Sequence, residues 1–135
     1  MQNSLISKEN IALMVREFYA IILKDEMLNP YFTKPLGTDL TNEKWQAHFD
    51  TLDSFWLTMM TSDQTYKGSP FPPHKLIGTL YLETFERWLE LFSATVHKYY
   101  IPEIADSFYE KADVMAQFFI KKLKVKNMND TEEGK

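Results

Sequence analysis

The 135-residue sequence contains no cysteine and only four glycines. Without a thiol, the chain cannot form disulfides, zinc knuckles or iron–sulfur clusters, and it has no cysteine nucleophile. Any metal ion must therefore be held by histidine or carboxylate side chains. The glycines, Gly37, Gly68, Gly78 and Gly134, are too scattered to form a phosphate-binding loop or a dinucleotide fingerprint. We therefore do not expect nucleotide chemistry.

Long apolar runs and basic clusters are also scarce. No apolar stretch is long enough to cross a bilayer, and residues 1–10 lack the basic and apolar regions of a signal peptide. The net charge is −4, and the basic run is limited to Lys121-Lys122-Leu123-Lys124. We therefore expect a cytoplasmic protein with neither a nucleic acid nor a membrane as its partner.

Aromatic residues, by contrast, are abundant: the chain has ten Phe, seven Tyr and three Trp. These rings bring a large, flat apolar surface that must be buried. One destination is an ordinary aromatic core, since most aromatic side chains are core residues. The other destination is a flat cofactor.

The spacing of apolar residues predicts an all-α fold. Helices are expected after the N-cap candidate Ser7, from Thr41 or Asn42 to about residue 60, over 83–99, and from Pro102 to about 123. Residues 29–37 contain two prolines and predict a tight connecting segment, and 61–73 predict a loop. We expect one domain over 1–135, with an ordered core from about 7 to 124 and a disordered tail over 125–135.

Histidines are the candidate metal ligands. His48, His74 and His97 include no pair at the i, i+4 spacing of helical zinc sites, which disfavours structural zinc. His48 lies on the apolar face of the second predicted helix, and His74 lies at the start of a short helix after the loop. The two imidazoles could therefore flank a flat ligand, although a hydrogen-bonded core histidine is the alternative for each. The same apolar face carries Trp45, Phe49, Leu52, Phe55, Trp56 and Met59.

Four segments, taken in order, resemble the third group of truncated hemoglobins (group III, P-type). They are Phe18-Tyr19, then His48 with Phe55-Trp56, then the run Tyr66-Lys-Gly-Ser-Pro-Phe-Pro-Pro-His74, and finally Phe85-Glu-Arg-Trp88-Leu-Glu-Leu-Phe92. Each segment alone is weak evidence for the resemblance, whereas their order and spacing in one chain are strong evidence. The resemblance covers nearly all of residues 7–124.

The resemblance implies a bacterial truncated globin, a two-over-two helical sandwich around heme b (iron protoporphyrin IX). His74 would be the proximal ligand of a five-coordinate iron, and neutral imidazole is the usual ligand in globins. Tyr19, His48 and Trp88 would surround a bound dioxygen, carbon monoxide, nitric oxide or cyanide on the opposite face. Ring and leucine side chains would form the pocket walls, although ordinary core packing is the alternative for each: Phe32, Leu52, Phe55 and Trp56.

Two features of the resemblance concern the heme periphery. The paired-glycine motifs of other truncated hemoglobin groups are absent, as expected for the third group, and Thr84 stands where many relatives have His. Contacts to the heme propionates are expected from some of four side chains near the pocket: Tyr66, Lys67, Lys75 and Arg87.

Three functions remain open at this point. The first is oxygen binding or transport without further chemistry. The second is a heme enzyme that detoxifies nitric oxide or peroxide with electrons from an external reductase. Hydrogen-bond donors beside the ligand would serve both of these functions, so the sequence does not separate them. The third is a helical adaptor without a cofactor.

Overall fold

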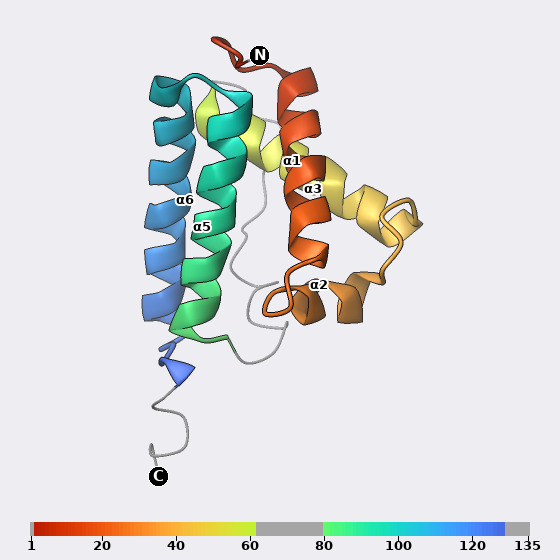
Figure 1. The fold of residues 1–135 in the computed structure, drawn as a ribbon, viewed down its shortest axis with the longest axis vertical. Helices are drawn as coiled ribbons and strands as arrows, with labels where there is room; N and C mark the ends of the chain where they lie inside the picture. Colours follow the sequence, from red (N-terminus) through yellow and green to blue (C-terminus); the bar gives the residue numbers. More distant parts are fainter. Residues whose placement is uncertain (1, 62–79, 129–135) are drawn as a thin grey trace.

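A computed structural model of the chain describes residues 2–61 and 80–128 (Figure 1). Its helices are α1 (Lys8–Leu23), α2 (Asn29–Leu36), α3 (Glu43–Met60), α5 (Leu82–Tyr99) and α6 (Pro102–Lys122). Within these ranges the chain forms isolated β-bridges but no strand, which confirms the all-α prediction. No helix in the described ranges has both the length and the apolar content that crossing a membrane requires.

Helix α1 begins where the sequence predicts. The Ser7 side chain accepts a hydrogen bond from the Asn10 backbone N–H at 3.0 Å, and the Asn10 side chain accepts one from the Ser7 N–H at 3.0 Å. This reciprocal capping satisfies two backbone donors that a helix start leaves free. The buried face of the helix consists of Ile11, Met14, Val15, Phe18, Tyr19 and Ile22.

Helix α2 replaces the connecting segment that the prolines had predicted. Pro30 lies in the first turn, where a missing N–H costs nothing and the fixed φ of proline suits a helix. Pro35 lies in the last turn, and Gly37, with φ of 86°, then ends the helix while its N–H bonds to Thr33 O at 2.8 Å. The prediction was wrong because Pro30 suits the first turn of a helix, and Pro35, although it lacks an N–H to donate, comes only one residue before the helix ends.

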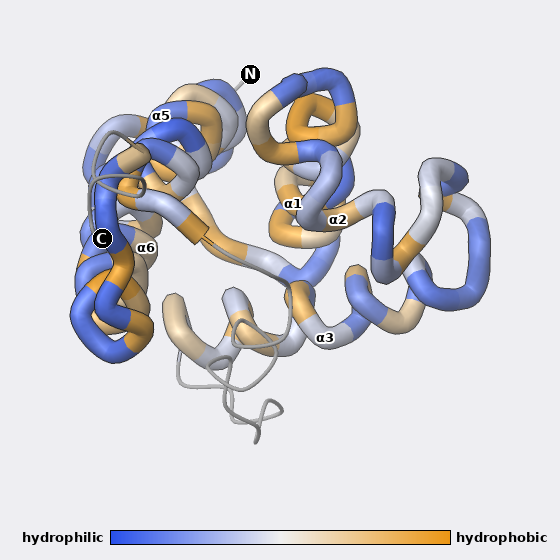
Figure 2. Tube along the Cα trace, turned by 90° about the horizontal axis from the view of Figure 1, so that it is seen from below, coloured by the Kyte–Doolittle hydropathy of each residue, from blue (hydrophilic) through white to orange (hydrophobic). Residues whose placement is uncertain are grey.

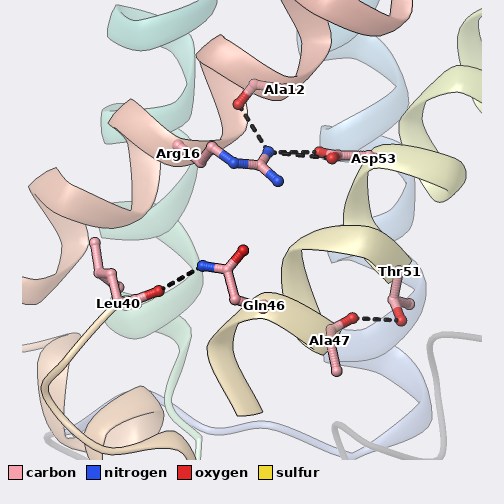
Figure 3. Close-up of polar contacts among 7 residues, drawn as sticks. All are labelled: Ala12, Arg16, Leu40, Gln46, Ala47, Thr51 and Asp53. Atoms are coloured by element: carbon pink, nitrogen blue, oxygen red, sulfur yellow. Dashed lines mark hydrogen bonds and ion pairs between the residues drawn. The ribbon is translucent and has the colours of Figure 1, made fainter. Parts of the chain in front are cut away.

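The helices pack in pairs. Helix α1 packs against α3 and α5, and α5 runs along α6 (Figures 1 and 2). Between α1 and α3, Nη1 of Arg16 lies 3.1 Å from Oδ2 of Asp53 (Figure 3), and the guanidinium sits 4.8 Å from the centre of the Phe49 ring. This arrangement leaves the inner faces of the helices around a shared interior.

The inward face of α3 differs from its prediction at one residue. Trp45, Phe49, Phe55 and Trp56 are buried as expected, whereas Met59 is 37% exposed. Met59 lies in the last turn of α3, beyond the four buried residues, so the apolar spacing continues past the part of the helix that is buried.

A tight turn ends α6. Lys124 has φ of 54°, Val125 N–H bonds to Ile120 O at 3.0 Å, and Lys124 N–H bonds to Lys121 O at 3.3 Å. These bonds form a Schellman motif, which usually has glycine at the left-handed position. Lys126 O then accepts from Leu82 N–H at 2.9 Å, so residues 125–128 pack beside the start of α5. The first residues of the expected tail are therefore tied to α5 by these hydrogen bonds.

Candidate functional site

A cavity of about 210 Å³ lies between the helices, and side chains of α1, α2, α3, α5 and α6 line it. Its wall is mostly apolar. The wall residues comprise Met14, Val15, Phe18, Tyr19, Leu28, Tyr31, Phe32, His48, Thr51, Leu52, Phe55, Trp56, Leu80, Thr84, Phe85, Trp88, Phe92, Ala112, Met115, Ala116 and Phe119.

Tyr19 brings a buried hydroxyl to this wall. It is 5% exposed and makes edge contacts with the rings of Phe32 at 5.3 Å and His48 at 5.4 Å. Burial raises the pKa of Tyr19 above the ordinary tyrosine value, and a hydrogen bond from Trp88 partly opposes this rise. Tyr19 therefore stays protonated at neutral pH and can donate a hydrogen bond.

His48 adds an imidazole from α3. Its ring is half-buried and stands edge-on to both Tyr19 and Trp45, with centroids 5.4 and 5.5 Å away. These two aromatic neighbours fix the side of α3 on which the imidazole lies. A polar ring thereby joins the Tyr19 hydroxyl at the cavity wall.

Trp88 contributes an indole from α5 and is held in a stack of rings. Its ring lies parallel to Phe92 at 5.1 Å, and Phe92 stacks in turn on Trp56 of α3 at 5.0 Å. Because an indole N–H can only donate, Trp88 acts on Tyr19 as a donor facing the tyrosine oxygen, which is how it lowers the pKa of that hydroxyl. The hydroxyl proton of Tyr19 therefore remains available to a third group.

Comparison with known proteins identifies the family, although no family model matches the chain. The chain is 31% identical, over 114 residues, to the group 3 truncated hemoglobin ctb of Campylobacter jejuni, a match that spans 84% of this chain and 88% of that protein. This chain is a group 3 truncated hemoglobin. The crystal structure of the group III truncated hemoglobin from Campylobacter jejuni superposes with a TM-score of 0.83 at 30% identity, covering 91% of this chain and 95% of that one. The family and the truncated-globin fold predicted from the sequence are thus confirmed.

The wall of this truncated hemoglobin brings together most of the residues singled out from its sequence. The predicted wall residues Phe32, Leu52, Phe55 and Trp56 all line the cavity. The predicted gas-side residues Tyr19, His48 and Trp88 line it as well. Tyr66, Lys67, His74 and Lys75 lie outside the described residues.

Arg87 is the exception among the candidates. Its Nε lies 2.7 Å from Oδ1 of Asp25, and its Nη1 lies 2.9 Å from Oε1 of Glu90. Arg87 does not line the cavity, although its neighbour Trp88 does. In this truncated hemoglobin the guanidinium therefore pairs with protein carboxylates, and its expected contact with a heme propionate gains no support.

Sequence reasoning missed two alanines. Ala112 and Ala116 are buried one turn apart on α6, where they alternate with the larger wall residues Met115 and Phe119. Small side chains there leave room beside the neighbouring rings. Their spacing of four on the apolar stripe of the last predicted helix was a usable signal, but small residues on a helix are more often simple packing.

A truncated hemoglobin is a heme-binding globin, and the wall fits that cofactor. Aromatic and aliphatic side chains offer an apolar surface to a porphyrin, and the alanines of α6 make space for it. The polar groups of Tyr19, His48 and Trp88 come from three different helices. A ligand site of this type is expected to be apolar with a few placed polar groups.

Proposed function

We propose that this truncated hemoglobin binds heme b through His74 and reversibly binds dioxygen on the opposite face of a five-coordinate iron. The observation that carries the proposal is the meeting of Tyr19, His48 and Trp88 at one apolar cavity. Three polar side chains from separate helices are more than such a cavity needs for packing, whereas a polar diatomic ligand requires hydrogen-bond donors.

The choice of His74 as proximal ligand rests on the resemblance and on the positions of the other two histidines. His48 lies beside Tyr19, on the side proposed for the gas. His97 lies at the end of α5, where Nδ1 is 2.7 Å from Ser93 O and Nε2 is 2.9 Å from Oδ1 of Asp106. His97 is not part of the cavity wall, so His74 is the histidine left for iron ligation.

The heme, when bound, supplies the iron that coordinates the gas, and the protein supplies donors and exclusion of water. The Tyr19 hydroxyl would donate to a ligand that carries partial negative charge, a bond worth about 1.5–3 kcal/mol. Trp88 would strengthen that donor by bonding to the tyrosine oxygen. Carbon monoxide, nitric oxide and cyanide would occupy the same position.

Reconstitution with heme tests the proposal. We expect the purified protein to take up one heme, to show an intense Soret band, and to give a five-coordinate ferrous spectrum that changes reversibly with dioxygen. His74→Ala should lose the histidine-ligated spectrum and regain it with added imidazole. The matched control, His97→Ala, should keep it.

Two results would contradict the proposal. Absence of a Soret band in the wild-type protein would show that the chain does not bind heme and would favour a helical adaptor without a cofactor. An unchanged ferrous spectrum in His74→Ala without imidazole would show that another residue ligates the iron. The expectations of a cytoplasmic location and of an external reductase belong to this proposal, and nitric oxide and peroxide consumption assays would distinguish an enzyme from an oxygen-binding protein.

A further inference from the structure

Thr84 holds a buried hydroxyl that the described protein does not satisfy. The residue is 5% exposed and forms part of the cavity wall. Its Oγ1 has no hydrogen-bond partner among residues 2–61 and 80–128. A buried hydroxyl in this situation is unfavourable, because it has lost its bonds to water and gained none in return. Such a group indicates a partner that the described residues do not provide.

Thr95, on the same helix, shows how a buried threonine is ordinarily satisfied. It is 2% exposed, and its Oγ1 donates to Leu91 O, one turn back, at 2.8 Å. Thr84 lacks this option because α5 begins at Leu82, so no helical carbonyl lies one turn before it. The carbonyl three residues before Thr84, Tyr81 O, already accepts hydrogen bonds from the N–H groups of Thr84 and Phe85 at 3.0 and 3.3 Å.

The side chains around Thr84 in the wall do not offer an acceptor either. Phe85 follows it in sequence and is apolar, and Trp88, one turn later on α5, has only a donor. That indole N–H is already directed to Tyr19. Beyond the part of the chain that the structure describes, the group that fills the cavity is a source of such an acceptor.

We propose that the Thr84 hydroxyl donates a hydrogen bond to an oxygen acceptor of that group and thereby acts as a positioning residue for it. This inference rests on the proposed function, in which the group is heme with its gas ligand. The oxygen acceptors are then a porphyrin carboxylate or the bound gas. Threonine in a helix populates two χ1 rotamers, so a rotation about χ1 can turn Oγ1 toward an incoming acceptor.

The test compares the heme-loaded wild type with Thr84→Val, Thr84→Ser and the control Thr95→Val. Valine keeps the shape of threonine without the hydroxyl. We expect Thr84→Val to accelerate one of two rates about ten- to a hundredfold, as for loss of a hydrogen bond to a charged or partly charged oxygen. If the acceptor is a carboxylate, the rate of heme loss, measured by transfer of heme to apomyoglobin, should rise. If the acceptor is the gas, the rate of dioxygen release should rise. Thr84→Ser and Thr95→Val should match the wild type.

A second arm distinguishes the two acceptors. With the dimethyl ester of heme, the difference in heme loss between Thr84→Val and the wild type should vanish if the acceptor is the carboxylate. If the acceptor is the gas, the stretching frequency of bound carbon monoxide should shift in Thr84→Val. Equal heme loss, equal dioxygen release and an unshifted frequency would overturn the inference while leaving the proposed function intact. Failure of the wild type to take up heme would instead overturn both.

Discussion

Arg87 and Asp25 form an ion pair that joins α5 to the turn following α1, with Nε and Oδ1 2.7 Å apart. The Asp25 side chain is only 9% exposed, and its other oxygen accepts from the Leu28 N–H at 3.1 Å. Leu28 and Trp88, the residue after Arg87, both line the cavity. The pair therefore sets the position of two parts of the wall without touching the cavity itself.

Replacing Arg87 by methionine should destabilise the protein without loosening the cofactor. A nearly buried Asp25 carboxylate would lose its charge partner, which we expect to lower the free energy of unfolding. Urea denaturation measures this change. Glu90→Gln is the control, because Glu90 is exposed and its loss leaves the Asp25 pair intact. Faster heme loss from Arg87→Met at unchanged stability would restore the propionate role expected from the sequence.

Tyr19→Phe should raise the dioxygen dissociation rate roughly ten- to a hundredfold, because it removes a donor to a partly charged ligand, and Trp88→Phe should raise it by a smaller factor, because Trp88 acts through that donor. Since Trp88 donates to the Tyr19 oxygen, the double variant should depart from additivity. Stopped-flow replacement of dioxygen by carbon monoxide measures these rates. Carbon monoxide release is the internal control, because that ligand is less polar. If Trp88→Phe stays within about twofold of the wild type, Trp88 serves only the ring stack with Phe92.

His48→Leu should change the rate at which ligands reach the cavity more than the rate at which they leave it. The imidazole is half-buried at the wall, and a swinging side chain there would obstruct access. Flash photolysis of the carbon monoxide complex measures the association rate. Thr51→Val is a matched control, because Thr51 also lines the cavity from α3 while its Oγ1 donates to Ala47 O at 3.1 Å (Figure 3). Equal association rates in His48→Leu and the wild type would rule out a gate.

Lys124→Gly should stabilise the protein by about 1 kcal/mol, because a side chain in the left-handed region is strained and glycine is not. The matched control is Lys121→Gly, in the last turn of α6, where glycine should destabilise by about the same amount. Thermal or urea unfolding of the two variants measures the change in stability of each and shows whether the two changes have opposite signs. A loss of stability in Lys124→Gly would mean that the lysine side chain contributes more than its backbone strain costs.

The sequence predicted the helix ends that depend on residues close together in the chain. The Ser7 cap, the α3 start at Asn42 and the Pro102 start of α6 follow from side chains next to the helix ends. The apolar face predicted for α3 supplies Leu52, Phe55 and Trp56 to the cavity wall, since one helical face must be buried, whereas most of the other lining residues were not singled out. The prediction of α2 failed because proline was interpreted as a breaker without regard to its position in the turn.

Other features could not be predicted from the sequence because they depend on contacts between distant parts of the chain. Arg87 pairs with a residue 62 positions earlier, and nothing near Arg87 in the sequence indicates that partner. The turn at Lys124 lacks the glycine that ordinarily marks it, so the packing of residues 125–128 could not be foreseen. The unsatisfied Thr84 hydroxyl likewise depends on where α5 begins, because a start one turn earlier would have supplied a helical carbonyl.

The placement of the tryptophans gives this protein an optical reporter. All three are concentrated at one place: Trp56 and Trp88 line the cavity on either side of Phe92, and Trp45 touches Tyr19 and His48. A porphyrin absorbs where indoles emit, so energy transfer over such short separations would extinguish their fluorescence. The intrinsic emission of the chain should therefore fall in proportion to the fraction of cavities that are filled, without any added label.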